Sequence, residues 1–197
     1  MLKNTFSAAA LALIGSALAA TASQAADTQR PKLFALTSPA MKSYAYMPDK
    51  YIGNNPQNHN CSGGNVSLPL SWKNAPDGTK SFAITMYDPA ARGGAGFVHW
   101  VAYDIPGDKK GLKEGEGNST TGFVGGKNGA GEASWRGPCA PPTDYPHPYI
   151  ITLVATDIAP GTLKSGMTRD ELGAALQGHA LGTTTFIARE AKPAKGS

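Results

Sequence analysis

Apolar and polar residues alternate with a period of two in several short runs of this 197-residue chain. Such alternation is typical of β-strands with one buried face. The pattern predicts strands over residues 66–72, 81–87, 97–105, 149–156 and 184–189. The run over 149–156 is almost continuously apolar, which favours a strand covered on both sides. The chain is therefore predicted to be mainly β, as a sandwich or a barrel with few helices.

The third of these runs contains His99, and its alternation predicts the face on which that histidine lies. Phe97, Val101, Tyr103 and Ile105 are expected to share one face with His99. A histidine in such a place is commonly a half-buried residue with one hydrogen bond satisfied. The pattern alone leaves this structural role and a ligand-binding role both open.

Helical periodicity is scarce, and one short helix is predicted. Thr168 and Glu171 have the spacing of a capping box ahead of apolar residues, so a helix is expected over 169–177. Residues 74–78 have the composition of a turn. The stretch 107–137 is polar and rich in glycine without a period, which predicts a long surface loop.

The first 25 residues have the features of a secretory signal peptide. Lys3 supplies a positive start, an apolar run rich in Ala and Leu follows, and residues 23–25 fit a cleavage site of small residues. Cleavage is expected after Ala25, with Ala26 as the alternative. A transmembrane anchor is the other interpretation, but the run is short and weakly apolar against a span of about 20 residues.

One domain is predicted over residues 26–191, followed by a disordered tail over 192–197. The expected location is periplasmic or secreted, without a transmembrane anchor. The formal net charge is +4, and the basic residues are scattered rather than clustered. Nucleic-acid binding is therefore not expected, whereas a positive balance modestly favours anionic ligands.

Two cysteines, Cys61 and Cys139, lie far apart in the chain. An even number of cysteines in an exported protein favours one disulfide, which here would close a long loop. Free or metal-binding thiols are the alternative, although there is no C-x-x-C spacing.

Titratable side chains stand at the ends of predicted strands, beside rigid proline or open-backbone glycine. Asp88 precedes Pro89 where one strand ends, and its carboxylate could accept a hydrogen bond from a ring nitrogen of His99. A carboxylate at that place would also favour the imidazolium form of His99, which suits an anion. His147 lies between two prolines that restrict its backbone, and the alternative for it is a surface-loop histidine.

Glycine and proline also mark the candidate pocket. Gly137 and Pro138 are predicted to expose peptide N–H groups at a turn, where such groups bind phosphate oxygens. Tyr149, Trp100 and Trp135 are candidates for the walls, although each alone is more typical of a core. The predicted site, a pocket for a small anion, comprises Asp88, Pro89, His99, Gly137, Pro138, Pro141, Pro142, His147 and Tyr149.

Other chemistries receive little support. The chain has no G-x-S-x-G elbow, no Walker-type loop and no Rossmann glycine motif after a strand. Its four histidines are dispersed without metal-ligand spacing, so a metal site made by three of them after folding is a minor alternative. Cys139 as a nucleophile conflicts with the expected disulfide. No catalytic residue, metal or cofactor is predicted.

Taken in order, these motifs resemble the phosphatidylethanolamine-binding proteins, in the exported bacterial branch usually called Raf kinase inhibitor-like. The resemblance covers nearly all of the chain after the signal peptide, and the number of ordered motifs makes it specific. The matching segments are 60–65, 70–72, 75–82, 87–89, 99–101, 105–106, 137–139 and 141–142, with His147 and Tyr149.

The resemblance implies an antiparallel β-sandwich with a small anion pocket at one end. In that family the pocket is built from positions that correspond here to Asp88, His99, Gly137, Pro138, Pro141, Pro142 and His147. The family binds phosphate-type groups such as phospholipid headgroups, and some members inhibit kinases or proteases. Exported relatives carry a cysteine pair placed like Cys61 and Cys139.

The chain departs from the family pattern at four places. Ala90 stands where the family usually has a second Asp, so the ligand affinity and type are open. Ala140 is an extra residue before Pro141, Pro148 replaces a common Arg, and Trp135 stands where Tyr or Phe is usual.

Three functions follow from these observations. The first is an exported, non-catalytic binding protein for a small anionic group, such as phosphate or a phosphorylated headgroup. The second is an inhibitor of a kinase or protease that acts through a protein target. The third is a weak hydrolase with His99 or His147 as general base.

Overall fold

A computed structural model describes residues 32–58, 61–142 and 145–191 of the chain. The predicted signal peptide (1–25) and the predicted tail (192–197) lie outside the described residues. The fold is that of the compact unit that begins at Phe34. No helix within the described ranges is long and apolar enough to cross a membrane.

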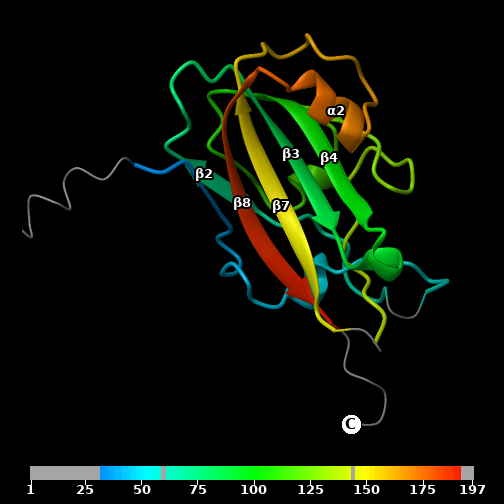
Figure 1. The fold of residues 1–197 in the computed structure, drawn as a ribbon. Helices are drawn as coiled ribbons and strands as arrows, with labels where there is room; N and C mark the ends of the chain where they lie inside the picture. The colour runs from blue at the N-terminus through cyan, green and yellow to red at the C-terminus, as the bar shows by residue number, and fades with distance from the viewer. Residues whose placement is uncertain (1–31, 59–60, 143–144, 192–197) are drawn as a thin grey trace, which may run out of the picture. The chain divides into compact units, whose positions relative to one another are not determined.

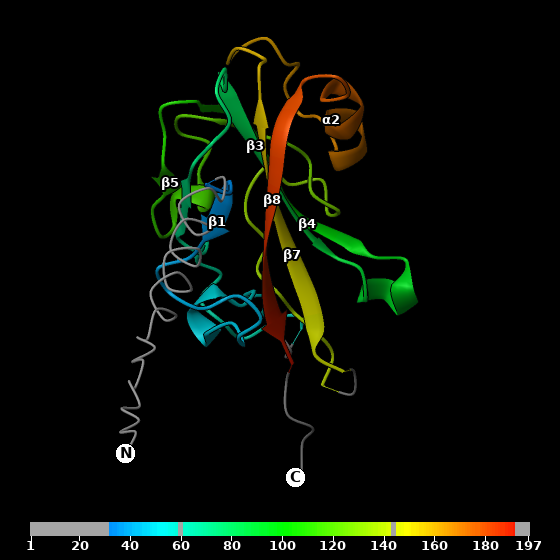
Figure 2. The same ribbon diagram turned by 60° about the vertical axis from the view of Figure 1, so that its left-hand side comes forward.

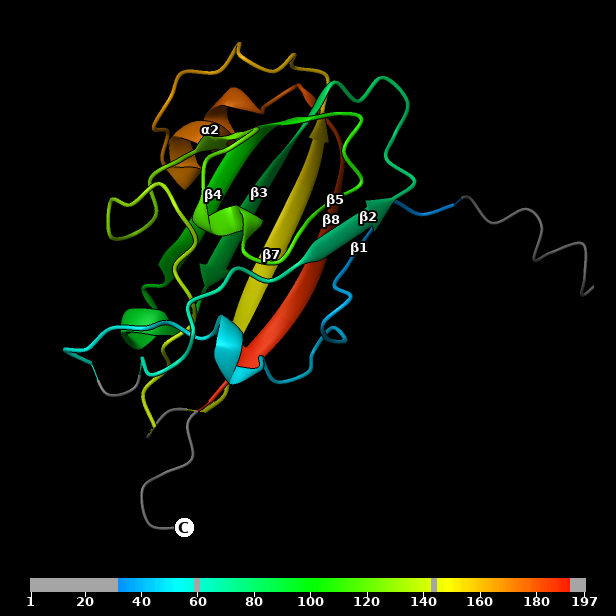
Figure 3. The same ribbon diagram turned by 180° about the vertical axis from the view of Figure 1, so that it is seen from behind.

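The fold consists of two antiparallel β-sheets (Figures 1 and 3). The three-stranded sheet has the order β1 (Ala35–Thr37), β2 (Leu70–Lys73), β5 (Gly111–Leu112). The five-stranded sheet has the order β6 (Val124–Gly125), β4 (Phe97–Pro106), β3 (Ser81–Asp88), β7 (His147–Thr156), β8 (Ala180–Glu190). Every pair of neighbours in both sheets is antiparallel. The prediction of a mainly β, antiparallel fold is confirmed.

All five predicted strands are present as β2, β3, β4, β7 and β8, although β2 is shorter than the predicted run. The capping box of Thr168 and Glu171 forms, and α2 (Arg169–Ala175) follows it. The predicted loop over 107–137 is not structureless, because it holds β5, the 3₁₀ helix η3 (Glu116–Asn118) and β6. These elements and β1 have only two or three residues each, which is too short for a hydrophobic period.

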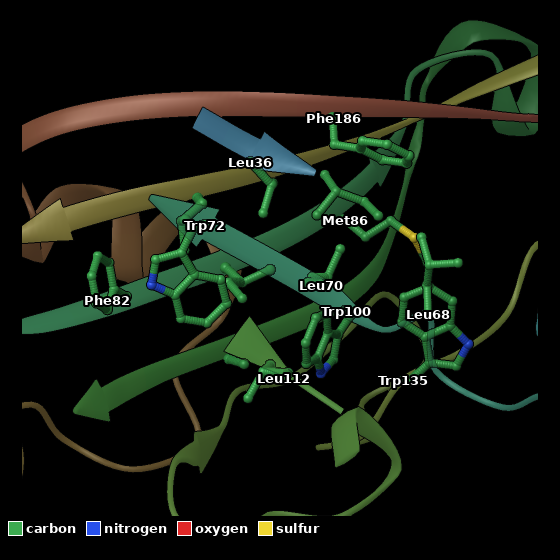
Figure 4. Packing of buried hydrophobic residues seen from close by; sticks show 14 of the residues in the cluster. Leu36, Leu68, Leu70, Trp72, Phe82, Met86, Trp100, Leu112, Trp135 and Phe186 are labelled. Carbon is green, nitrogen blue, oxygen red and sulfur yellow. The ribbon is translucent and has the colours of Figure 1, made fainter. Parts of the chain in front are cut away.

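The main core lies between the two sheets. Leu36, Leu70 and Trp72 of the small sheet pack against Phe82 and Met86 of the large one, as Figure 4 shows. A second cluster lies on the opposite face of the large sheet, where α2 packs on β3 and β4 (Figure 2). The large sheet is therefore covered on both faces along β3 and β4.

The predicted alternation along β4 is wrong, because this strand has two register irregularities against β3. Val101 and Tyr103 pack in the cluster under α2, whereas Ile105 lies in the core between the sheets. One irregularity leaves His99 without a Cα partner on β3, since Met86 pairs with Trp100 and Tyr87 pairs with Val98. A β-bulge at this place redirects the His99 side chain, as bulges beside binding sites commonly do.

Candidate functional site

A cleft of about 690 Å³ lies at one end of the large sheet. At this end β3 and β8 finish and β4 and β7 begin, and the directions of the strands can be followed in Figure 1. The cleft is walled by the segments 53–58 and 61–65, by the turn η2 (Ala91–Gly94) and by residues 132–141. Of the predicted site residues, its lining includes Asp88, His99, Gly137, Pro141, His147 and Tyr149.

Asp88 is buried at the end of β3, and its carboxylate is surrounded by hydrogen-bond donors. Oδ1 accepts from the backbone N–H groups of Ala90 and Ala91 at 2.9 and 3.2 Å, which forms a turn into η2. Oδ2 is 2.7 Å from Nδ1 of His147. The sequence predicted His99 as the partner of Asp88, and this prediction is wrong. The carboxylate instead fixes the orientation of the His147 ring.

His99 is held by the main chain of the neighbouring segment. Its Nδ1 donates to the carbonyl oxygen of Arg136 at 2.9 Å, while the backbone N–H of Arg136 donates to the carbonyl of His99 at 3.1 Å. Burial lowers the pKa of His99 from 6.5 to about 4, against smaller opposing contributions from its backbone hydrogen bonds and Asp88. The predicted imidazolium form is therefore wrong for the protein at neutral pH. His99 is a neutral ring with its proton on Nδ1.

Three rings that line the cleft, those of Phe97, His99 and Tyr149, contact one another in turn. The guanidinium of Arg92 lies 4.7 Å from the centre of the Phe97 ring, and that ring meets His99 edge-on at 4.8 Å. His99 in turn meets Tyr149 edge-on at 5.1 Å. Burial first, and then the nearby carboxylates of Asp88 and Glu190, raise the pKa of Tyr149. Tyr149 therefore stays protonated.

The backbone at Gly137 does not offer the predicted anion-binding N–H group. Its N–H donates to Oδ1 of Asn65 at 2.8 Å, and Pro138 has no N–H at all. Glycine is required here for packing instead, because a Cβ on Gly137 would lie 2.5 Å from the backbone nitrogen of Gly53. Pro89, Pro138 and Pro142 do not line the cleft.

Cys61 and Cys139 form a disulfide with Cα atoms 5.1 Å apart, across 78 positions of sequence. Both cysteines line the cleft. The bond joins the segment 61–65 to the segment that carries Gly137 and Pro141. The extra residue Ala140 is also anchored, because its N–H donates to the buried carboxylate of Glu190 at 2.7 Å.

Several cleft residues were not predicted from the sequence. Arg92 and Arg136 bring positive charge, and Glu132 binds Arg136 through both carboxylate oxygens at 2.9 and 3.0 Å. Amide side chains also line the loop wall. These additional lining residues include Asn54, Asn55, Asn58, Asn65, Phe97 and Ser134. Apart from Phe97 of β4 and Asn65 of the matching segment 60–65, these residues lie outside the predicted strands and the motifs, so neither alternation nor a motif points to them. Trp135 both lines the cleft and belongs to the core, whereas Trp100 belongs to the core alone.

The described residues that line the cleft include equal numbers of basic and acidic side chains, apart from the histidines. Among the described residues, Arg92 and Arg136 stand against Asp88 and Glu132, so the cleft is formally neutral when its histidines are neutral. The described residues also contain no group of three His, Cys, Asp or Glu side chains that could hold a metal ion.

Acid is expected to destabilise the protein through His99. Between pH 6.5 and about 4 the unfolded ring binds a proton that the folded ring does not, so the free energy of unfolding falls as pH drops through this range. The slope from this one group is at most about 1.4 kcal/mol per pH unit. Urea unfolding at pH 7, 6 and 5 measures how the free energy of unfolding changes with pH. His99→Asn should flatten the profile relative to His179→Asn, an exposed histidine paired with Asp157; equal slopes would contradict this account.

The fold and the cleft define a class of protein, an antiparallel β-sandwich with a ligand-sized cleft at the end of its larger sheet. The family described as phosphatidylethanolamine-binding protein matches residues 37–190. The chain therefore belongs to the phosphatidylethanolamine-binding protein family, as its motifs indicated.

Individual relatives agree with this membership. The UPF0098 protein of Methanothermobacter thermautotrophicus is 37% identical over 138 residues, which cover 68% of this chain and 89% of the relative. The UPF0098 protein YbcL of Escherichia coli is 42% identical over 100 residues, or 48% of this chain and 55% of the relative. The crystal structure of E. coli YbcL, described as a new member of the mammalian PEBP family, aligns with a TM-score of 0.73 and 30% identity. That alignment covers 82% of this chain and 99% of YbcL.

Proposed function

We propose that this protein is an exported, non-catalytic binding protein that holds a small anionic group of the phosphate type in the cleft. Membership of the family supports a binding role. The observation that carries the proposal is the meeting of Asp88, His147 and His99 in one cleft, from three different strands. The signal peptide predicted over residues 1–25 supports export.

The geometry fits a small polar ligand. The buried carboxylate of Asp88 fixes the His147 ring, and the main chain of Arg136 fixes His99, so two imidazoles are held in place before a ligand enters. Preorganised groups lose little conformational freedom on binding. Arg92 and Arg136 supply guanidinium groups, which bind phosphate oxygens well. Together these side chains offer donors and acceptors around a space of suitable size for a phosphorylated headgroup.

Titration of the protein labelled with ¹⁵N at histidine tests the proposal. Phosphate, phosphoethanolamine and phosphotyrosine are added in turn, and the ring signals of His99 and His147 are expected to move while those of His179 stay in place. His179 is the internal control, because it is exposed and lies outside the cleft. Unchanged His99 and His147 signals with all three compounds would overturn the proposal.

Replacement of His99 by alanine is expected to abolish detectable anion binding while the fold remains. The variant removes a ring that lies between Phe97 and Tyr149 and that faces the cleft. Calorimetric titration measures the binding, and circular dichroism reports the fold. His179→Ala should bind like the unmodified protein. Binding by a folded His99→Ala variant with unchanged affinity would show that the site is assigned wrongly.

A further inference from the structure

The protonation state of the cleft bears on the kind of anion that it can accept, and this inference rests on the proposed function. Nδ1 of His99 donates to the carbonyl of Arg136, so Nε2 of the neutral ring has no proton and is a hydrogen-bond acceptor. A fully ionised anion has only acceptor oxygens. An acceptor nitrogen and an acceptor oxygen repel each other unless a proton lies between them.

Two of the charged side chains that line the cleft with His99, Asp88 and Arg136, are already paired with other groups. The Asp88 carboxylate is occupied by the N–H groups of Ala90 and Ala91 and by His147. Glu132 neutralises Arg136 through two hydrogen bonds. The titratable and charged groups of the described cleft lining near His99 are Asp88 from β3, Arg92 from η2, Glu132 and Arg136 from the adjoining segment, and His147 and Tyr149 from β7.

The two negative charges of a dianion would be poorly compensated in this cleft. With both histidines neutral, the two arginines of the described lining are balanced by its two carboxylates, so a doubly charged ligand would leave two negative charges uncompensated in a partly desolvated cleft. A monoanion that carries its own proton leaves only one. The same proton also satisfies Nε2 of His99.

We propose that the cleft binds phosphomonoester-type groups as the protonated monoanion, with the P–O–H of the ligand donating to Nε2 of His99. The proton is taken up from solvent with the anion and stays between the ligand oxygen and the ring nitrogen. Protonation by the buffer forms the O–H bond of the ligand, and no other covalent bond is made or broken. Phosphodiesters, such as an intact phospholipid headgroup, and sulfate have no such proton at neutral pH and bind more weakly.

Two matched pairs of ligands test this selectivity. Phosphoethanolamine is compared with glycerophosphoethanolamine, its diester counterpart, and inorganic phosphate is compared with sulfate, which has the same shape. At pH 5.5 the proton-bearing member of each pair is expected to bind at least tenfold more tightly. Since the second pKa of a phosphomonoester is about 6, its affinity should fall roughly tenfold per pH unit above that value.

Calorimetric titration in buffers of different ionisation enthalpy measures the number of protons taken up when the ligand binds. At pH 7 phosphoethanolamine binding should take up close to one proton, and at pH 5 the uptake should approach zero because the ligand arrives protonated. His99→Asn retains an amide donor for the Arg136 carbonyl but lacks Nε2, and it should lose both the proton uptake and the discrimination between the members of each pair. His179→Asn is the matched control and should keep both.

A measurement on the unmodified protein tests the proposal even if the His99→Asn variant does not fold. The ¹⁵N shift of His99 Nε2 in the unmodified protein should be that of an unprotonated nitrogen without ligand and should move toward the protonated value with phosphate. If phosphate and sulfate bind equally well and no proton is taken up, the proton-coupled proposal is overturned while anion binding stands. If none of the four compounds binds, the proposed function is overturned as well.

Discussion

Replacing Asp88 by asparagine is expected to weaken phosphate binding at least tenfold and to lower the free energy of unfolding by about 2 kcal/mol. The buried carboxylate accepts hydrogen bonds from the backbone N–H groups of Ala90 and Ala91, and it fixes His147 at 2.7 Å. Asparagine keeps the shape but turns one acceptor into an NH₂ donor. That group would face donors in a buried place, so the ring of His147 would lose its orientation.

The chain contains a matched control for this substitution. Asp157 holds His179 through the same contact, with Oδ1 and Nδ1 2.8 Å apart, but this pair is exposed and lies outside the cleft. Asp157→Asn should change stability by no more than about 0.5 kcal/mol and should leave phosphate affinity unchanged. Calorimetry and urea unfolding compare the two variants. Similar effects in both would mean that the Asp88–His147 pair has no special role.

Removal of the disulfide is expected to be the most destabilising change. For the double variant Cys61→Ser/Cys139→Ser, the closed loop of 78 positions predicts a loss of about 4 kcal/mol in unfolding free energy. Phosphate affinity should fall too, because the bond holds two walls of the cleft together. Guanidinium unfolding and calorimetry measure both effects.

Reduction provides the control for the disulfide prediction. A reductant should reproduce the loss of stability in the unmodified protein and should have no further effect on the double variant. An unfolding midpoint that is unchanged in the double variant would contradict the prediction. Loss of stability with full retention of phosphate affinity would show that the bond supports the fold but not the cleft.

The turn that follows Asp88 departs from the family pattern at Ala90. The family usually has a second Asp there, whereas this chain has only the backbone N–H of Ala90, which donates to Asp88. The turn at the end of β3 therefore forms without that carboxylate.

The strands and the helix could be predicted from sequence because local spacing determines them. Alternation located β3, β4, β7 and β8 to within a few residues, and the capping box located the start of α2. The motifs around Asp88, His99 and His147 pointed to one end of the sheet, because antiparallel strands bring those positions together. The pairing of the two cysteines followed from their number.

The partners of each site residue could not be predicted in this way. Asp88 and His99 are near in sequence and stand at adjacent strand ends, yet Asp88 binds His147, which is 59 positions away. The bulge at His99 depends on how β4 registers against β3, and alternation within one strand carries no information about register. The second irregularity, between Ala102 and Ile105, places Val101 and Ile105 on opposite sides of the sheet.

By itself, the sequence determined the strand-rich fold, the family and most of the residues at the cleft, because these follow from short-range patterns and ordered motifs. Only the tertiary structure decided the charge of the cleft and the protonation of His99. Both depend on burial and on groups from distant loops, namely the Arg136 carbonyl and the Glu132 carboxylate. A cleft expected to be cationic is thereby formally neutral among its described residues when His147 is neutral, with an acceptor nitrogen on His99.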